Sequence, residues 1–508
     1  MTVARTWAVA LTGLDGHLVE VEADLTNQTP DFRIIGLGDK ALGEAVLRVR
    51  NATANSGLDL PRRRLTVNLS PAALPKQGSG FDVAIAVAAL ATEGGLDAAS
   101  VASTVHVGEL GLDGRLRPVP GVLPAVVAAA RAGMQRVVVP HANLAEARLV
   151  NGIDVHGAVN LAAVAARHGA DVEAHDETPV ALDARVTPPS APLDLVDVVG
   201  QADAVETIVV AAAGGHHVLM SGPPGAGKTM LARRMPGILP DLDDRAALAC
   251  ASILSLSGRP VAELSRTPPF EAPHHSASMA ALVGGGSRVV RPGAIARASG
   301  GILFLDEAGE FAGSALDALR QPIEQGAIEI HRAGVTAAFP ARFQLVLATN
   351  PCPCGQYGVR GGSCVCTPMA IRRYLGRLSG PLLDRIDIEL HLERVSVATR
   401  DSRHPRLTTV QARERVIAAR ARAAHRLRDT PWTVNVAVSG AWLRDGPHAP
   451  SPTVRRPLDT ALHRGGITLR GYDRVLRVAW SLADLAGRAQ LGLDDVGRAL
   501  YLKKGLML

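Results

Sequence analysis

The pattern of apolar and polar residues divides the first part of this chain into strands and helices. Apolar and polar positions alternate over 7–11, 17–22 and 64–69, which predicts half-buried β-strands. Apolar residues recur at helical spacing over 81–90 and 122–130, which predicts helices that bury one face. The first part of the chain therefore mixes strand-like and helix-like segments.

Three short apolar runs further along the chain show little alternation. They cover 217–221, 301–305 and 343–348. Runs of this kind are typical of strands in a parallel sheet that is covered on both faces. A basic, alanine-rich segment over 410–428 has the period of a helix, and its arginines indicate either a solvated face or contact with nucleic acid.

A segment without periodicity separates these two parts. Residues 171–195 are rich in proline and acidic residues, which predicts a linker. We therefore expect one domain at 1–170 and an α/β domain at 196–395.

The composition is that of an ordinary globular protein. Of the 508 residues, 47% are hydrophobic and 20% are charged, and the formal net charge of +6 permits a polyanionic partner without requiring one. No N-terminal segment has the features of a signal peptide, and the apolar runs at 82–92 and 122–131 are too short to span a bilayer. We expect a cytoplasmic protein with no membrane partner.

A glycine-rich turn after the run 217–221 fits the phosphate-binding pattern G-x-x-x-x-G-K-[ST] without a mismatch. Its residues, which we expect to bind ATP, are Gly222, Pro223, Pro224, Gly225, Ala226, Gly227, Lys228 and Thr229. The glycines let successive backbone N–H groups turn toward a phosphate. Lys228 is then expected to reach the β- and γ-phosphates, and the Thr229 hydroxyl to hold Mg²⁺. A chance lysine in a glycine-rich turn is the alternative.

Two carboxylates follow the run 301–305. Because ligands of open parallel sheets bind at the carboxyl ends of the strands, Asp306 and Glu307 can serve the same site. We expect Asp306 to bind Mg²⁺ through water and Glu307 to polarise the attacking water. Acidic residues are common in turns after strands, so it is their combination with the phosphate-binding loop that predicts ATP hydrolysis.

Four of the five cysteines lie in the loop 351–367, spaced C-x-C, nine residues, C-x-C. They are Cys352, Cys354, Cys364 and Cys366. Four thiolates around one Zn²⁺ would form a tetrahedral structural site, although C-x-C is tighter than the common C-x₂-C. Free thiols and a redox pair are the alternatives. The fifth, Cys250, lies in an apolar helical run and is expected in the core.

The N-terminal part resembles the proteolytic domain of Lon-type proteases. The resemblance rests on 108–118, on the helix and strand that follow it, and on 75–82, which resembles the serine loop of that family. That family uses a Ser–Lys dyad, but here the two positions hold Gly80 and Leu123. A serine without its base is not an activated nucleophile, so the resemblance implies a Lon-like fold without peptidase activity, with Ser79 as a turn residue.

The segment 198–206, before the phosphate-binding strand, resembles the entry helix of AAA+ ATPases. In those proteins a polar residue at the tip of the strand after the carboxylates, called sensor 1, orients the attacking water against the γ-phosphate. The resemblance assigns this role to Asn350.

The segment 380–387 resembles the arginine-finger segment of the AAA+ clade that contains magnesium chelatase. This implies that Arg385 reaches into the ATP site of a neighbouring subunit. The alternative is that Arg385 pairs with Asp384 or Asp387.

Two insertions, at 272–288 and 327–339, resemble those of helicase-type AAA+ proteins, where they line a central pore. The second alternates about a turn and predicts a β-hairpin. His331 and Arg332 near its tip are candidates for substrate contact, with a solvated turn as the alternative.

The segment 467–479 resembles the helical lid of the same clade, which implies a lid domain at 396–508. In that lid an arginine called sensor 2 contacts the γ-phosphate. Arg470 is the first candidate for this role and Arg474 the second.

Taken together, these parts resemble the YifB/ComM family over nearly the whole chain. The resemblance implies a P-loop AAA+ fold with a helical lid, preceded by a Lon-like α+β domain. It also implies a ring, hexameric on DNA, that uses ATP and Mg²⁺ for helicase or branch-migration activity in recombination or DNA uptake. The alternatives are a chelatase-type motor that remodels a protein partner for metal insertion, and an ATP-dependent protease, which the missing dyad disfavours.

Overall fold

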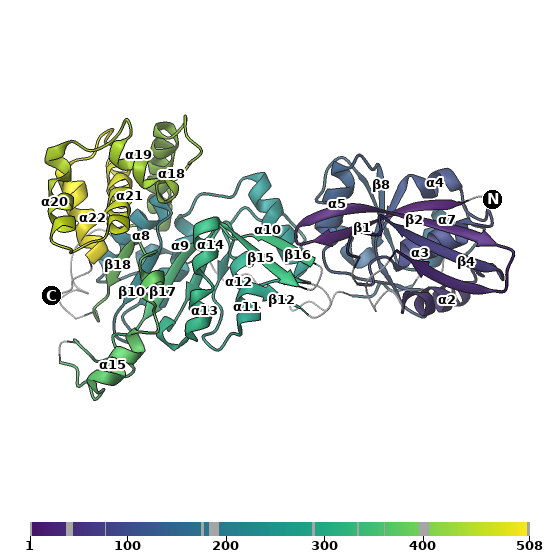
Figure 1. Cartoon of the computed structure of the whole chain (residues 1–508), viewed down its shortest axis with the longest axis horizontal. Helices are drawn as coiled ribbons and strands as arrows, with labels where there is room; N and C mark the ends of the chain where they lie inside the picture. Colours follow the sequence, from purple (N-terminus) through teal and green to yellow (C-terminus); the bar gives the residue numbers. More distant parts are fainter. Residues whose placement is uncertain are drawn as a thin grey trace.

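The computed structural model describes residues 3–36, 44–76, 78–173, 177–181, 193–286, 290–332, 335–359, 361–395 and 406–504. Three bodies follow one another along the long axis (Figure 1). A mixed sheet with helices lies at one end, a parallel sheet with helices lies in the middle, and a group of helices lies at the other end. Most of the predicted linker lies outside the described residues, as do 396–405.

The N-terminal body is built on a seven-stranded mixed sheet in the order β3-β4-β2-β1-β5-β8-β9. The strands are β1 (Ala4–Thr12), β2 (Asp15–Thr26), β3 (Asp31–Ile35), β4 (Arg64–Ser70), β5 (Thr104–His106), β8 (Arg136–Pro140) and β9 (Asp154–Ala158). A separate antiparallel pair comprises β6 (Glu109–Leu110) and β7 (Leu116–Arg117). The helices are α2 (Ala45–Asn55), α3 (Asp82–Ala91), α4 (Ala98–Ala102), α5 (Val122–Arg131), α6 (Leu144–Ala147) and α7 (Leu161–Arg167). The α+β expectation is confirmed.

The central body contains a five-stranded parallel sheet in the order β11-β14-β17-β10-β18. The strands are β10 (Val218–Ser221), β11 (Phe270–Glu271), β14 (Ile302–Leu305), β17 (Gln344–Thr349) and β18 (Ile388–His391). Each residue of β14 and β17 is buried, as the apolar runs predict. The surrounding helices are α8 (Ala202–Gly214), α9 (Lys228–Ile238), α10 (Asp244–Leu256), α11 (Met279–Val283), α12 (Ala294–Arg297), α13 (Gly313–Asp317), α14 (Arg320–Gln325), α15 (Pro368–Leu375) and α16 (Gly380–Leu383).

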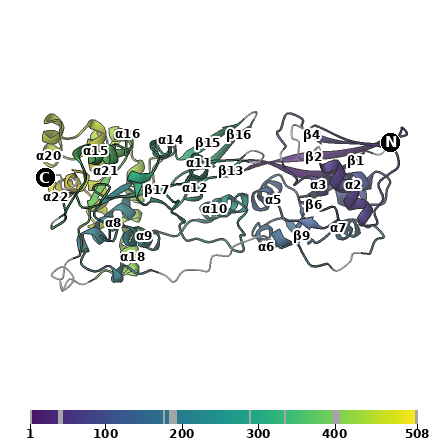
Figure 2. The same cartoon turned by 90° about the horizontal axis from the view of Figure 1, so that it is seen from below.

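Two small antiparallel pairs lie on the side of the central body that faces the N-terminal sheet (Figures 1 and 2). The hairpin of β15 (Ala327–Arg332) and β16 (Val335–Pro340) forms where alternation predicts it. The other pair comprises β12 (Gly284–Gly285) and β13 (Arg291–Pro292).

The C-terminal body is helical. Its helices are α18 (Thr409–Arg426), α19 (Gly440–Asp445), α20 (Pro452–His463), α21 (Leu469–Leu485) and α22 (Leu493–Lys504). Thr408 and Gln411 form a capping box that starts α18, since each side chain accepts from the other's backbone N–H. The buried stripe of α21 joins one core with α8 of the central body, so the lid is packed firmly against the sheet domain. No helix among the described residues is both long and apolar enough to cross a bilayer.

The N-terminal and central bodies touch through α5 and α10. The backbone N–H of Leu123 donates to Ser255 Oγ at 3.4 Å, and that of Gly121 donates to Ser255 O at 3.1 Å. Leu123 is fully buried and packs with Ala251 and Val261. The position that the resemblance to Lon-type proteases assigns to the dyad lysine is therefore part of this contact.

Candidate nucleotide-binding site

The residues that sequence patterns assign to ATP lie at one edge of the central sheet. Strands β14, β17 and β10 are parallel neighbours, so the loops that follow them begin at the same edge. The loop after β10 turns at Gly225 and Gly227, whose φ angles of +79° and +88° suit glycine. Gly227 is also the N-cap residue of α9, so the loop runs directly into a helix N-terminus, where backbone N–H groups and the helix dipole favour a bound phosphate.

Lys228 is held inside this loop. Its Nζ donates to the carbonyl oxygens of Gly222 at 2.6 Å and Pro223 at 3.1 Å, and to Asn350 Oδ1 at 3.0 Å. Burial lowers the pKa of Lys228, while the charges of Asp306 and Glu307 oppose that shift. A buried ammonium with neutral acceptors is a group that an anionic phosphate would stabilise.

The two predicted Mg²⁺ residues also meet. Thr229 Oγ1 donates to Asp306 Oδ2 at 2.6 Å, and the other carboxylate oxygen of Asp306 accepts from the backbone N–H of Glu307 at 3.0 Å. Hydroxyl and carboxylate oxygens are the hard ligands that Mg²⁺ prefers. This donor set therefore fits the ion.

Glu307 has an unusual backbone. Its φ of +52° is the only positive value at a non-glycine residue in the described part of the chain, and such a conformation carries strain. Its carboxylate lies 3.3 Å from Nδ1 of His275, and about half of the side chain is exposed. Sequence patterns do not point to His275, which lies in the first insertion.

Gln201 supports the loop from the side. Its Nε2 donates to the carbonyl oxygens of Ala226 at 2.6 Å and Glu393 at 3.3 Å. This residue lies in the segment that resembles the AAA+ entry helix, but only the fold shows that it ties the phosphate-binding loop to the chain after β18.

Arg385 is turned into its own chain. Its side chain is 9% exposed and donates to Pro381 O at 2.5 Å and to the carboxylate of Glu324. The alternative that Arg385 pairs with Asp384 or Asp387 is therefore wrong about the partner, which is Glu324. Service to a neighbouring subunit stays a prediction, and it requires Arg385 to leave Glu324.

The second sensor 2 candidate, Arg474, lies away from the phosphate-binding loop of its own chain. Arg474 pairs with Asp387, which directly precedes β18, and donates to Arg385 O at 2.8 Å. The amino ends of the strands form the edge opposite the candidate ATP site. Arg470 is exposed near the start of α21, one turn before Arg474. Contact of Arg470 with a γ-phosphate stays a prediction.

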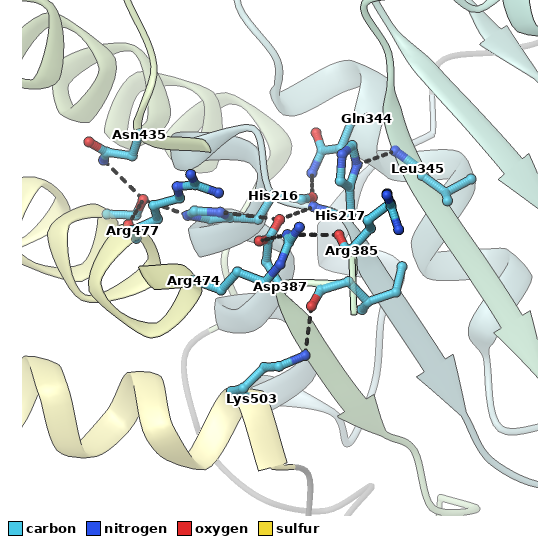
Figure 3. Close-up of polar contacts among 12 residues, drawn as sticks. His216, His217, Gln344, Leu345, Arg385, Asp387, Asn435, Arg474, Arg477 and Lys503 are labelled. Atoms are coloured by element: carbon cyan, nitrogen blue, oxygen red, sulfur yellow. Dashed lines mark hydrogen bonds and ion pairs between the residues drawn. The ribbon is translucent and has the colours of Figure 1, made fainter. Parts of the chain in front are cut away.

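A buried polar cluster surrounds Asp387 (Figure 3). The carboxylate accepts from the backbone N–H of His217 at 2.9 Å and lies 3.7 Å from Nδ1 of His216. Burial lowers the pKa of His217 to about 4, and its Nδ1 accepts from the backbone N–H of Leu345 at 3.0 Å. Burial would raise the pKa of Asp387, but Arg474 and His216 outweigh it and hold that pKa well below its usual value.

The four loop cysteines form a compact group. Their sulfur atoms all lie within 4.8 Å of one another, and Cys352 Sγ is 3.4 Å from Cys354 Sγ and 3.8 Å from Cys364 Sγ. Sulfur atoms bound to one tetrahedral Zn²⁺ lie about 3.8 Å apart, so this donor set fits zinc. These distances are too long for disulfide bonds. Cys250 lies apart, and burial raises the pKa of its thiol to about 11.

The cysteine loop also touches the phosphate-binding loop. A Cβ built on Gly355, whose φ is +73°, would lie 2.4 Å from Cδ of Pro224. Cys352 also follows Asn350 by only two residues. The cysteine group therefore adjoins the candidate site both at Asn350 and at Pro224.

The arginines of α18 serve mainly to hold the fold together. Arg415 pairs with Glu206, Arg426 pairs with Asp484, and Arg420 donates to Ala212 O at 2.7 Å. Burial lowers the pKa of Arg420 to about 10. These partners disfavour a simple solvated face, and they leave less positive charge for nucleic acid than the sequence suggests.

The residues that the sequence singles out in the insertions and in the N-terminal body lie in separate places. His331 is exposed near the tip of the β15–β16 hairpin, while the side chain of Arg332 lies outside the described parts. In the N-terminal body, Ser79 Oγ donates to the carboxylate of Glu109. Arg288, at the end of the first insertion, also lies outside the described residues.

Comparisons with known proteins match this layout. Residues 194–400 match the family described as magnesium chelatase, subunit ChlI; residues 21–143 match subunit ChlI of Mg-chelatase, and residues 406–503 match the ChlI C-terminal family. The chain is 48% identical over 508 residues to an uncharacterized protein of Mycobacterium tuberculosis, covering 99% of each chain. It is 39% identical to competence protein ComM of Haemophilus influenzae, covering 98% of this chain and 97% of ComM. It is also 39% identical to YifB of Escherichia coli, covering 96% and 94%. Over 143 residues it is 32% identical to Lon protease of Mycolicibacterium smegmatis, which is 27% of this chain and 18% of that protease.

Proposed function

The chain belongs to the YifB/ComM family of magnesium chelatase-like AAA+ proteins, and from this premise we propose that it is a ring-forming motor that hydrolyses ATP to act on DNA. The observation that supports the proposal most is the hydrogen bond of Lys228 to Asn350, beside that of Thr229 to Asp306. These contacts bring four predicted residues from three strand ends to one place.

The roles of these residues follow from their chemistry. Lys228 would exchange its carbonyl partners for the β- and γ-phosphates, and the N–H groups at the start of α9 would bind phosphate oxygens. Thr229 and Asp306 would hold Mg²⁺, which spreads the charge that develops on the phosphates. Glu307 would accept a proton from the attacking water, and Asn350 would orient that water.

Two of the candidate arginines face other groups of their own chain. Arg385 faces Glu324, and Arg474 faces Asp387 at the opposite sheet edge. We propose that Arg385 and Arg470 act on the nucleotide of a neighbouring subunit, which would make hydrolysis depend on a ring. A hexamer is the ring that the family resemblance implies.

The DNA substrate is proposed from the relative and from the insertions. ComM is named a competence protein, and competence is the uptake of DNA. The β15–β16 hairpin presents His331 near its tip, where an exposed side chain can meet a substrate. We propose helicase or branch-migration activity on single-stranded or branched DNA during recombination or DNA uptake.

The same comparisons keep a second function open. The family names refer to magnesium chelatase, whose motor would act on a protein partner for metal insertion. The N-terminal part is also similar to Lon protease, and this similarity and the cysteine loop support the DNA motor over the chelatase-type motor. We also propose that the chain is divided into an N-terminal domain at 1–170, a linker at 171–195, a nucleotide-binding domain at 196–395 and a helical lid at 396–508.

We further propose that the four loop cysteines hold a structural Zn²⁺ beside the ATP site, because their sulfur separations match a tetrahedral site. The bound ion would fix the loop, and Gly355 would then hold Pro224 in place.

Phosphate release by the full chain, measured across a panel of partners, tests the function. We expect single-stranded or branched DNA to raise the turnover, whereas casein does not. Stimulation by a chelatase-type partner protein and by no DNA would instead support the second function.

A further inference from the structure

A pocket of about 670 Å³ opens in the helical body, where the C-terminal ends of α18 and α21 lie near each other. Four arginines and two aspartates line its wall. The arginines are Arg422, Arg426, Arg428 and Arg488, and the aspartates are Asp429 and Asp484. A concave wall with an excess of guanidinium groups favours an anionic ligand, and the volume is within the range of pockets that hold small molecules.

The pocket is tied to the sheet edge opposite the candidate ATP site. Asp484 Oδ2 accepts from Asn435 Nδ2 at 2.8 Å, and the same amide donates to Ser481 Oγ at 3.0 Å. Ser481 Oγ lies 2.7 Å from Nε2 of His216, which comes two residues before β10. These contacts connect the wall of the pocket to the amino edge of the central sheet, whereas Lys228 lies at the carboxyl edge.

Two of the four arginines are compensated by buried carboxylates. Arg426 pairs with Asp484, its side chain is 8% exposed, and its guanidinium carbon lies 4.0 Å from the ring centroid of Trp480. Arg488 pairs with Asp495, whose side chain is 2% exposed. These two pairs therefore shape the pocket and add little net charge to it.

The other two arginines supply most of the uncompensated charge. Arg422 is exposed, and its Nη1 donates to a neutral group, the carbonyl oxygen of Asp484, at 2.7 Å. Arg428 Nε lies 3.4 Å from Asp429 Oδ2, and both of these side chains are mostly exposed, so the pair is weak. Guanidinium groups match the geometry of phosphate oxygens and bind them through charge-assisted hydrogen bonds. Arg422 and Arg428 are thus available to bind a phosphate.

An aromatic ring lies in the same wall. His448 lines the pocket, and its ring is packed between two tryptophans, with centroid separations of 5.6 Å to Trp442 and 6.1 Å to Trp480. Rings of histidine and other aromatic side chains stack with nucleic-acid bases. A guanidinium pair beside a fixed ring suits a phosphate that carries a base better than it suits a bare carboxylate.

We propose that this pocket is a second nucleotide site, in which Arg422 and Arg428 bind a phosphate group and His448 stacks with the base. The nucleotide is either one unit of a nucleic-acid strand or a free nucleotide, since both carry the same phosphate and base. The site goes beyond the proposed function, which assigns ATP to the carboxyl edge of the central sheet and DNA to the β15–β16 hairpin.

The double variant Arg422→Gln/Arg428→Gln removes the two available charges and leaves both ion pairs of the wall in place. Arg456→Gln/Arg464→Gln is the matched control, because it removes two exposed arginines from α20 and its C-cap, outside the pocket. His448→Ala removes the ring that would stack with the base. Circular dichroism melting checks that each variant folds.

The full chain is first saturated with a non-hydrolysable ATP analogue, so that the candidate ATP site is occupied. Thymidine 5′-monophosphate is then titrated and followed by the quenching of tryptophan fluorescence, because Trp442 and Trp480 lie beside His448. A short, fluorescently labelled oligothymidylate strand is titrated separately and followed by anisotropy. The probe that wild type binds more tightly identifies the source of the nucleotide.

We expect Arg422→Gln/Arg428→Gln to weaken binding of that probe at least several-fold. If the probe is the strand, the slope of log affinity against log salt should also become shallower by about 1 for each arginine lost. His448→Ala should weaken binding without changing this slope, and the matched control should keep the wild-type affinity.

Three results overturn the site: wild type binds neither probe, the folded double variant keeps the wild-type affinity for both probes, or the matched control loses as much affinity as the double variant. The titrations require no hydrolysis, which separates them from the proposed function. A wild-type chain that hydrolyses no ATP would refute the motor, and the titrations would still decide whether the pocket binds a nucleotide.

Discussion

Arg474 of the C-terminal helices forms an ion pair with Asp387, which is fully shielded from solvent and directly precedes β18 (Figure 3). The pair fastens the helical lid to the amino-terminal edge of the central sheet. Lys228 lies at the opposite edge, where it contacts Asn350. Arg474 therefore does not contact the candidate ATP site of its own chain.

Breaking this pair should weaken the attachment of the lid. The substitution Asp387→Ala leaves the buried guanidinium of Arg474 without its carboxylate, which should cost about 3–5 kcal/mol of unfolding free energy. Denaturant unfolding followed by tryptophan fluorescence measures this, because three of the four tryptophans, Trp432, Trp442 and Trp480, lie in the helical body. Asp429→Ala, which removes an exposed pair with Arg428, should not change the transition. Equal effects would contradict the role of Asp387.

Acid should destabilise the same interface. The pKa of His217 is about 4 in the folded protein and about 6.5 when exposed, so the unfolded chain binds the proton more tightly. Its contribution to stability is complete above pH 6.5 and falls by about 3 kcal/mol as the pH decreases through 4. Tryptophan-monitored unfolding at a series of pH values should show this loss. In His217→Gln the amide oxygen can still accept from the backbone N–H of Leu345, so the free energy of unfolding should depend less on pH. An unchanged pH dependence would show that another group causes the loss.

Removing the proposed base should stop turnover and spare binding. Glu307→Gln should lower kcat by at least about 100-fold, because an amide cannot take the proton of the attacking water. Glu310→Gln is the matched control, since Glu310 lies three residues on and pairs with Arg377. Phosphate release measures the rate, and a fluorescent ATP analogue measures affinity. A similar loss of kcat in Glu310→Gln would show that the effect is structural and would contradict the role of Glu307 as the base.

Arg385 should act across the subunit boundary. Rings that contain only Arg385→Ala subunits should hydrolyse ATP slowly, as should rings of Glu307→Gln subunits. Mixed rings should recover part of the activity, because some sites combine an intact Glu307 with an intact neighbouring Arg385. Phosphate release across mixing ratios measures the recovery. Well-formed mixed rings without any recovery would leave Arg385 as a structural partner of Glu324.

The cysteine group should bind one zinc ion per chain. Elemental analysis of the purified protein measures the ratio, and Cys354→Ser should lower both the zinc content and the affinity for the ATP analogue, since the loop contacts Pro224. Cys250→Ser, outside the group, should leave the zinc content unchanged. Full zinc content in the Cys354→Ser variant would place the metal elsewhere.

The sequence could predict most of the central sheet and the members of the candidate site. Apolar runs mark strands buried on both faces, and parallel strands bring their carboxyl ends to one edge, which is why Asp306 could be placed near Lys228. The resemblance to AAA+ ATPases places Asn350 there, and its contact with Lys228 agrees with that placement. The resemblance to the YifB/ComM family is confirmed by matches over nearly the full chain. The functional roles of these residues remain predictions.

Partners that lie far apart in the sequence could not be predicted. Glu324, which holds Arg385, lies 61 positions away, and Asp387 lies 170 positions from His217. Local patterns carry no information about such contacts, because tertiary packing decides them. The same limit applies to His275 and Glu307, which meet only through the path of an insertion, and to the arginines of α18, whose partners come from α8 and α21.

The central claim is that ATP hydrolysis between subunits moves DNA, and strand displacement tests it most directly. A fluorescently labelled branched DNA is incubated with the full chain and ATP, and the released strand is measured over time. We predict release by wild type with ATP, and none by Glu307→Gln or without ATP. Wild-type protein that hydrolyses ATP as an assembled ring, yet displaces no strand from forked or four-way DNA, would contradict the account.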